Sequence, residues 1–180
     1  MGGGEWVHAS APYVKARQEG QRDAWSAETA AQGRSGTQRI VHARETAAPA
    51  RVGTLLGVGE GTDVVERRRA IYLDGEATEL TDSYYPVEIA RGTALAGTAR
   101  IRGGAVTLLA GLGHTAHLVR EEVSARLPSP AEQESLNLGA TDPVLQLTRV
   151  TSGADGRPFQ VDVSVFPAST QQLRYEMRVD

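Results

Sequence analysis

The segment from Val64 to Pro86, VVERRRAIYLDGEATELTDSYYP, constrains the fold more than any other part of this sequence. Two runs rich in β-branched and aromatic residues flank the dipeptide Asp74-Gly75. An Asp-Gly pair suits the two-residue turn of a β-hairpin, because both central positions of that turn need a positive φ angle. The segment therefore predicts a long hairpin, and a chain organised around it contains an antiparallel sheet.

The composition limits the class of protein. The 180 residues, 40% of them hydrophobic, suffice for one ordinary domain with its own core. The formal net charge is -3, so the chain as a whole lacks the excess positive charge that neutralises DNA phosphates. We therefore expect the chain alone not to bind duplex DNA. The lack of cysteine excludes disulfides, thiolate catalysis and cysteine-based metal sites. No apolar run has membrane-spanning length and MGGGE lacks a signal-peptide pattern, so we expect a cytoplasmic protein.

Local patterns predict the other elements. Residues 1–22 show no sustained periodicity and are interpreted as a linker. Ser26 can cap a short Ala-rich helix that ends at Gly33. The sequence SPAE at 129–132 has the spacing of a capping box with proline in the first turn, which predicts a helix to about Leu138. Further helices are expected at 49–57 and 105–113, and further strands at 37–45, 117–127, 143–151, 157–166 and 171–179.

The order of these elements predicts an α+β fold. Strands 143–151 and 157–166 flank Gly-Ala-Asp-Gly and form a second hairpin. The connections inside both hairpins are far too short for the crossover that parallel neighbours require. We therefore expect an antiparallel β-sheet with helices packed on it.

Several motifs, taken in order, resemble the UTRA domain, the effector-sensing half of GntR/HutC-type bacterial transcription regulators. The first hairpin carries the family's Arg-rich strand, Asp-Gly turn and Ser-Tyr-x-Pro ending. The segments WSAE at 25–28, PVLQLTR at 143–149 and GRP at 156–158 also follow the family pattern, as does the region 125–136 if small shifts are allowed. The resemblance covers about 25–180 and implies a chorismate-lyase-like fold in a domain over residues 23–180. In that fold the helices lie on one side of the sheet and a ligand pocket lies near it.

This resemblance implies a ligand-sensing, dimerising domain that is not an enzyme and needs no cofactor or metal. The implied partners are a small acidic or polar effector and a second copy of the chain, with no membrane. DNA would be contacted only through a winged helix-turn-helix domain absent from this sequence, and residues 2–7 resemble the end of its wing. We favour a sensor cut from a longer regulator over a natural chain without the DNA-binding domain. Two alternatives stay open: an enzyme of the chorismate-lyase type, and a free-standing sensor that pairs with an intact regulator.

The hairpin register selects candidate binding side chains. A tight two-residue turn places Arg67 opposite Asp82 and Arg69 opposite Leu80, with both arginines and Asp82 on one face. A loop one residue longer would exchange the faces. The resemblance puts a pocket arginine at Arg69, whose guanidinium can hold a phosphate or carboxylate through two parallel hydrogen bonds. The alternative is a solvated ion pair on an exposed face.

The second hairpin offers a polar face as well. Gln160 and Asp162 alternate with Phe159, Val161 and Val163, which predicts one apolar face in the core and one face toward solvent or a pocket. In the family pattern, Gln160 stands in place of a glutamate. 

The remaining candidates follow from helix starts and from the resemblance. Ser26 combines a hydroxyl with free backbone N–H groups, although simple capping explains it equally. Gly104 precedes the central helix, where the family often has serine. Compared with the sugar-phosphate-sensing members, Thr81 and Gln160 replace glutamates and Ile71 replaces an arginine, so we expect a ligand that is less highly charged than an amino-sugar phosphate or is bound differently. The candidate ligand-binding residues are Trp25, Ser26, Arg67, Arg69, Thr81, Asp82, Ser83, Gly104, Gln160 and Asp162.

Overall fold

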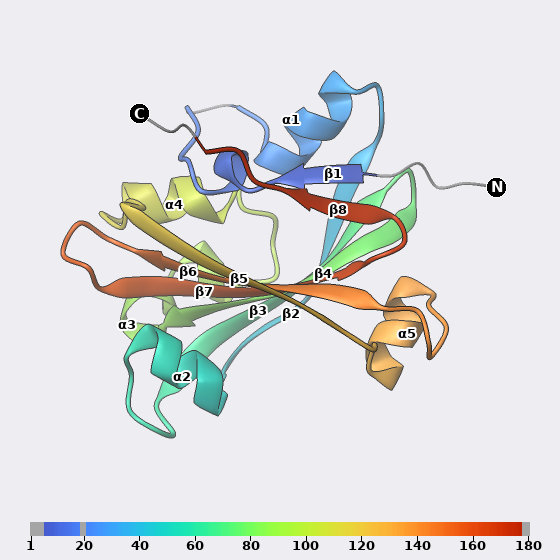
Figure 1. Cartoon of the computed structure of the whole chain (residues 1–180). Coiled ribbons are helices and arrows are strands. Elements are labelled where there is room, and N and C mark those ends of the chain that lie inside the picture. The colour runs from blue at the N-terminus through green and yellow to red at the C-terminus, as the bar shows by residue number, and fades with distance from the viewer. Residues whose placement is uncertain (1–5, 19–20, 178–180) are drawn as a thin grey trace.

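The computed structural model describes residues 6–18 and 21–177, and these form an α+β structure around a six-stranded sheet (Figure 1). The strand order is β2-β3-β4-β7-β6-β5, and every neighbouring pair is antiparallel. The predicted antiparallel sheet is thereby confirmed. The strands are β2 (Gly36–Ala47), β3 (Asp63–Leu73), β4 (Glu76–Pro86), β5 (Leu118–Arg126), β6 (Val144–Ser152) and β7 (Pro158–Pro167).

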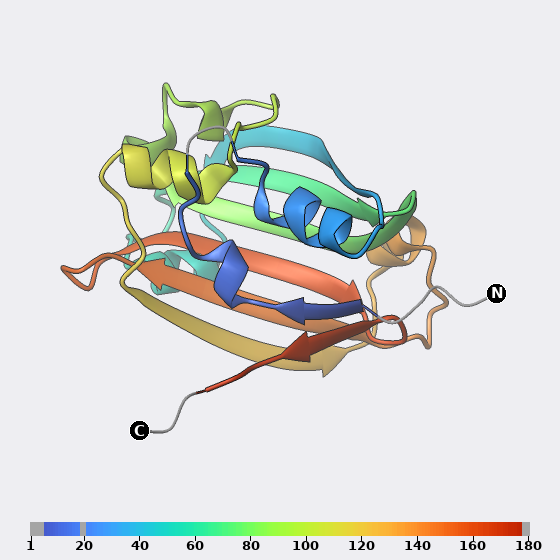
Figure 2. The same cartoon turned by 90° about the horizontal axis from the view of Figure 1, so that it is seen from above.

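Helices cover both faces of this sheet rather than one (Figures 1 and 2). In the view of Figure 1, α1 (Ala24–Ala31) and α4 (Ala105–Gly111) lie above the sheet. Below it lie α2 (Ala50–Leu56) and α5 (Pro130–Leu136), the latter with the predicted capping box. The short helices α3 (Val87–Ala90) and η2 (Ala94–Ala96) follow β4. None of the helices in the described part of the chain has the length and apolar character to cross a membrane.

A second, two-stranded sheet lies above the main one. The strands β1 (Trp6–Ala9) and β8 (Gln171–Arg174) pair in parallel, and the turn η1 (Ala11–Tyr13) follows β1. Part of the segment interpreted as a linker therefore forms a strand. Local periodicity could not predict this, because the pairing partner, β8, lies at the other end of the chain. Residues 1–5, which carry most of the proposed wing end, and 178–180, the end of the last expected strand, lie outside the described residues.

The first hairpin forms as predicted, but its register differs by one residue. A β-bulge leaves Thr78 without a partner between the pairs that flank it. Arg67 therefore pairs with Ser83, Arg68 with Asp82, and Arg69 with Thr81. The expected pairs Arg67–Asp82 and Arg69–Leu80 are wrong, and Asp82 lies on the face opposite to Arg67 and Arg69. The extra residue in β4 exchanges the faces, as one additional residue in the loop would have done.

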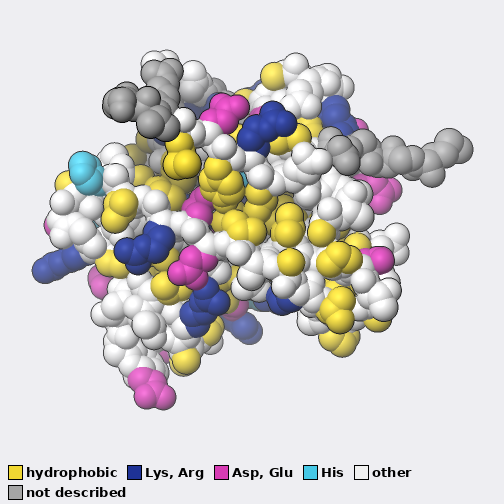
Figure 3. All heavy atoms as spheres, in the orientation of Figure 1, with side chains coloured by type: hydrophobic (Ala, Val, Ile, Leu, Met, Phe, Trp, Pro, Cys, Tyr) yellow, Lys and Arg dark blue, Asp and Glu magenta, His cyan; other side chains and the backbone are white. Residues whose placement is uncertain are grey.

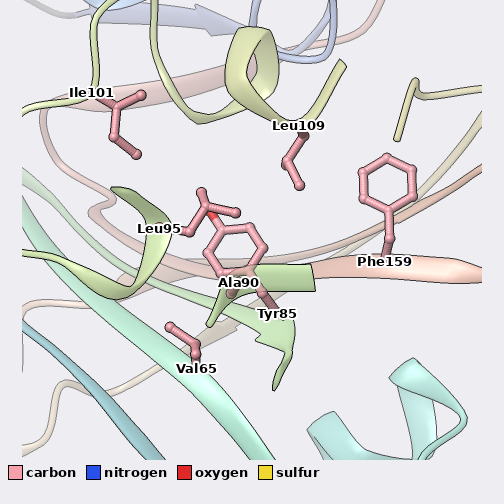
Figure 4. Close-up of a cluster of buried hydrophobic side chains, with 7 residues drawn as sticks. All are labelled: Val65, Tyr85, Ala90, Leu95, Ile101, Leu109 and Phe159. Atoms are coloured by element: carbon pink, nitrogen blue, oxygen red, sulfur yellow. The ribbon is translucent and has the colours of Figure 1, made fainter. Parts of the chain in front are cut away.

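Apolar clusters hold the helices on the two faces. Val52 and Leu56 of α2 pack with Val64, Tyr84 and Val161 below the sheet. On the upper face, the cluster in Figure 4 joins the sheet to α3, η2 and α4. Its buried members are Val65, Tyr85, Ala90, Leu95, Ile101, Leu109 and Phe159.

Phe159 departs from the expected alternation of β7. It packs with Tyr85 and Leu109 on the upper face, although the sequence placed it on the same face as Val161. The pairing of β6 with β7 shifts between Thr151 and Ser152, and this irregularity turns Phe159 away from the face that alternation assigns to it.

Candidate functional site

A cavity of about 120 Å³ lies between the upper face of the sheet and the layer above it. Strands β2, β3, β4, β6 and β7 contribute side chains to its floor. The start of α1, the residues that lead into α4, and residues 8–17 line the remaining walls. Figure 2 shows these segments lying over the sheet. The polar face of β7 predicted for solvent or a pocket thus lines the cavity.

Arg69 on the cavity floor has unused hydrogen-bonding capacity. One terminal nitrogen of Arg69 donates to Ser83 Oγ at 3.2 Å. Its Nε is buried and has no hydrogen-bond partner among the described residues, and the side chain makes no ion pair within them. A buried donor without a partner is costly, and a charged one more so. The guanidinium is therefore available to an anion in the cavity.

Asp162 forms the acidic side of the same floor. Ser83 Oγ donates to Asp162 Oδ1 at 2.5 Å, and Gln160 Nε2 donates to both carboxylate oxygens at 2.9 and 2.8 Å. Ser83 thus connects Arg69 to Asp162 without direct contact between the two charges. Nearby, Glu79 accepts a hydrogen bond from Thr81 Oγ1. Neither carboxylate has a cation within 4.0 Å in the described part of the chain.

Arg67 lines the cavity, but both of its terminal nitrogens already donate hydrogen bonds to the protein. Its guanidinium donates to the carbonyl oxygens of Ala94, Gly97 and Ala99 at 3.2, 2.5 and 2.9 Å. The residue is 3% exposed, and burial lowers the pKa of the guanidinium below its ordinary value. Arg67 therefore fastens the loop after η2 to β3. Arg69, two residues later on the same face of β3, keeps a buried donor without a partner among the described residues.

Trp25 and Gly104 form part of the opposite wall. Trp25 Nε1 donates to the carbonyl oxygen of Tyr72 at 3.1 Å, and the ring meets Trp6 edge-on at 5.1 Å between centroids. Gly104 precedes α4 with a φ angle of 86°, a value that a residue with a side chain adopts only with strain.

Three of the predicted site residues do not line the cavity: Ser26, Asp82 and Ser83. Ser83 is 0% exposed and is connected to the cavity through its hydrogen bonds with Arg69 and Asp162. Asp23, and not Ser26, caps α1, since its carboxylate accepts from the Ser26 backbone N–H at 3.0 Å. The Ser26 hydroxyl donates to the same carboxylate and accepts from Arg100. Asp82 accepts two hydrogen bonds from Arg68 on the lower face of the sheet, at 2.6 and 2.5 Å. The cap of α1 lies three residues earlier than expected, and the bulge moves Asp82 to the lower face, so neither Ser26 nor Asp82 reaches the cavity wall.

The N-terminal segment contributes side chains that the sequence did not single out. His8, Tyr13, Lys15 and Arg17 line the cavity. His8 stacks on Tyr13 with ring centroids 4.5 Å apart, and burial lowers the pKa of His8. The Tyr13 hydroxyl donates to Glu28 at 2.5 Å, and burial together with this hydrogen bond raises the pKa of Tyr13. The segment lacks periodicity, so its role depends on the β1–β8 pairing that brings it across the sheet.

Arg149 illustrates the difference between a paired and an unpaired cavity arginine. Its Nε donates to Glu121 at 2.6 Å, and both side chains are 10% exposed. Burial alone would raise the pKa of Glu121, but Arg149 holds it below its ordinary value. Arg149 also donates to Ser10 at 3.1 Å, which ties the N-terminal segment to β6.

The cavity thus combines an available guanidinium with hydrogen-bond acceptors on a mixed polar and apolar wall, which suits the binding of a small polar molecule. A protein-family model described as the UTRA domain matches residues 31–172. The chain belongs to the UTRA domain family. The resemblance identified from the sequence is confirmed, and the UTRA domain model covers the hairpins, α4 and the cavity floor.

One curated relative resembles the UTRA chain over nearly its whole length. It is an uncharacterised HTH-type transcriptional regulator of Streptomyces coelicolor, 32% identical over 177 residues. The match covers 93% of the present chain and 64% of that relative. The chain therefore spans less than two thirds of the regulator that it matches.

Solved structures share the fold. The effector domain of PhnF from Mycobacterium smegmatis superposes with a TM-score of 0.74 at 21% identity, covering 86% of this chain and 94% of that one. A crystal structure of a putative GntR-family transcriptional regulator gives a TM-score of 0.82 at 22% identity, covering 98% and 71%. At these identities the similarity establishes the fold of the UTRA domain.

Proposed function

We propose that this UTRA domain binds a small organic oxyanion, a phosphate ester or a carboxylate, as the effector of a HutC-type transcription regulator. The observation that carries the proposal is the buried Nε of Arg69, which has no hydrogen-bond partner among the described residues although it borders the cavity. A guanidinium fork matches a carboxylate or phosphate through two hydrogen bonds. An anion in the cavity would satisfy the donors that the protein leaves unused.

The acceptors beside Arg69 define the rest of the ligand. Asp162 and Glu79 offer carboxylate oxygens that no cation in the described residues neutralises. Hydroxyl or ammonium groups on the ligand would donate to them. The effector is therefore a polar molecule with an anionic group at one end and hydrogen-bond donors at the other. The neutral Gln160 and Thr81 complete this polar wall.

The UTRA family and the HTH-type relative support a role in transcription. In this proposal, effector binding changes the arrangement of a DNA-binding domain that is not among the described residues. The domain itself catalyses no reaction, and it acts in the cytoplasm, where the DNA lies.

Comparison of neighbouring arginines tests the binding site. A thermal-shift screen of small metabolites first finds the effector through the stabilisation that a native-state ligand confers. Arg69→Ala should then weaken its binding by roughly tenfold or more, since hydrogen bonds to charged groups contribute about 1.5–3 kcal/mol. Arg68→Ala is the control, because Arg68 lies on the lower face with Asp82. Equal affinity of Arg69→Ala and the parent, or a larger loss in Arg68→Ala, would refute the assignment.

We also propose that two copies pair through the free edge of β5. In the described part of the chain this strand ends the main sheet; it exposes Leu118 and Val123, and Leu127 directly after it is exposed as well. In Figure 1, β5 crosses the front of the molecule. Figure 3, in the same orientation, shows apolar atoms gathered on this front face. An unpaired, apolar strand edge is a template for pairing with another strand, and two-fold dimers are the commonest closed assemblies.

Matched substitutions at the two sheet edges test the dimer. Val123 in β5 is 46% exposed, and Val41 in the opposite edge strand β2 is 47% exposed. A buried, unpaired carboxylate opposes association, so Val123→Glu should convert a dimer to a monomer in light scattering. Val41→Glu should leave the dimer intact. A monomeric parent protein, or loss of the dimer in Val41→Glu alone, would contradict the proposal.

A further inference from the structure

A second arginine of the cavity has the same unusual environment as Arg69. The Nε of Arg17 is buried and has no hydrogen-bond partner among the described residues, and Arg17 lines the cavity. Its side chain makes no ion pair in the described part of the chain. Among the described residues, the buried side-chain atoms without a partner are the Nε of Arg17, the Nε of Arg69 and the indole nitrogen of Trp6. Two of these three therefore belong to guanidinium groups on one cavity.

The two arginines come from structurally independent walls. Arg69 is in β3, at the centre of a strand that is paired on both sides. Arg17 belongs to the N-terminal segment that crosses above the sheet after β1 and η1 (Figure 2). A ligand held by both would bridge the sheet and this segment. Lys15, also on the cavity wall, adds positive charge from the same side.

Few polar contacts fasten the N-terminal segment beyond β1. Ser10 Oγ donates to Glu121 and accepts from Arg149, and the Tyr13 hydroxyl donates to Glu28, so the first part of the segment is held by bonds to charged groups. Near Arg17 itself, the contact with the rest of the domain is the hydrogen bond from the Arg17 backbone N–H to Thr107 Oγ1 at 3.1 Å, in the described part of the chain. This bond joins two neutral groups and contributes little, so an added charge-assisted contact at Arg17 shifts the balance between fastened and released conformations of this end of the segment.

We infer that Arg17 is a second effector-binding residue and that an oxyanion bound between Arg17 and Arg69 fastens the N-terminal segment to the sheet. The inference rests on the proposed function of the cavity. It assigns the same ligand two points of attachment, one on the fixed floor and one on the segment that follows β1. Effector binding then has a direct mechanical consequence at the N-terminal side of the domain, because it favours the conformation in which residues 8–17 lie over the cavity.

Inorganic phosphate and succinate serve as separate probes, titrated at constant ionic strength. They distinguish a phosphate-type from a carboxylate-type anion. The parent should bind one of them, and Arg17→Ala and Arg69→Ala should each weaken that binding by about tenfold or more. Arg22→Ala is the matched control, because Arg22 is exposed and lies outside the cavity wall. The urea midpoint of Arg17→Ala without probe should equal that of the parent, which separates ligand binding from a structural role.

Limited trypsin digestion measures whether the bound anion holds the N-terminal segment on the sheet. Cleavage after Lys15 should slow when the bound probe saturates the parent, and the probe should give no such protection in Arg69→Ala. Normal binding in Arg17→Ala with weakened binding in Arg69→Ala would overturn the inference and leave the proposed function intact. Failure of the parent to bind either probe would overturn both. Equal losses in Arg22→Ala, or unchanged cleavage of the saturated parent, would also overturn it.

Discussion

Arg67 and Arg69 are two residues apart on the same face of β3, yet we expect opposite consequences when each is removed. Arg67 donates three hydrogen bonds to the carbonyl oxygens of the loop at 94–99 and is 3% exposed. Arg69 makes one hydrogen bond, at 3.2 Å, and its buried Nε has no hydrogen-bond partner among the described residues. Arg67→Ala should therefore impair folding stability, and Arg69→Ala should impair binding.

The magnitude follows from the contacts of Arg67. Each hydrogen bond from a charged donor contributes about 1.5–3 kcal/mol, but three bonds from one guanidinium are not independent. We expect Arg67→Ala to lower the free energy of unfolding by about 3–4 kcal/mol, within the usual loss for a broken buried charge network. For a chain of this size that corresponds to a fall in Tm of about 6–16 °C. The variant should remain folded at 25 °C if total stability lies in the common range of about 5–15 kcal/mol.

Urea unfolding monitored by the fluorescence of Trp6 and Trp25 measures this difference. These tryptophans pack together at the edge of the cavity layer, so their emission reports on its integrity. Arg69→Ala should change the urea midpoint little, and Arg67→Lys should recover part of the loss, because lysine keeps the charge but lacks the fork. A destabilisation of Arg69→Ala as large as that of Arg67→Ala would refute the division of roles.

Two further predictions concern the stability of local elements. The hydrogen bonds of Arg126 lower the pKa of Glu132 to about 2, so this ion pair stabilises the folded state above the ordinary glutamate pKa near 4.5 and is lost as pH falls towards about 2. The difference in urea midpoint between Glu132→Gln and the parent should shrink over that pH range, whereas Glu134→Gln, on an exposed residue of the same helix, should show no such trend. Gly75→Ala should lower the free energy of unfolding by about 1–2 kcal/mol, because the φ angle of Gly75 is 89°. Gly111→Ala should raise the free energy of unfolding by about 0.5–1 kcal/mol, because Gly111 lies at the end of α4 with open space around it. Calorimetry that gives a change of the same sign for both variants would contradict this prediction.

The sequence by itself determined the features that depend on neighbours along the chain. The Asp-Gly turn requires positive φ at both positions, and together with the β-rich runs on either side it specifies the hairpin of β3 and β4. In the capping box the Ser129 and Glu132 side chains each accept from a backbone N–H three residues away, so their spacing predicts the start of α5. The alternation in β7 likewise predicted that Gln160 and Asp162 share one face.

Tertiary structure decided which side chains meet at the cavity. A single unpaired residue, Thr78, exchanges the faces of β4 and removes Asp82, because the side-chain period of a strand is two. Arg67 and Arg69 are equivalent in the sequence, but a loop about 30 residues later occupies the donors of one and not of the other. Contacts at such separation leave no local periodicity.

The N-terminal segment shows the same limit most clearly. Its residues have no helical or strand period, and β1 forms because β8, from the far end of the chain, supplies a parallel partner. That pairing carries His8, Tyr13 and Arg17 over the sheet. Local backbone preferences act over a few residues and are encoded where they act, whereas the cavity is assembled by pairing and packing between segments that meet only in the folded chain.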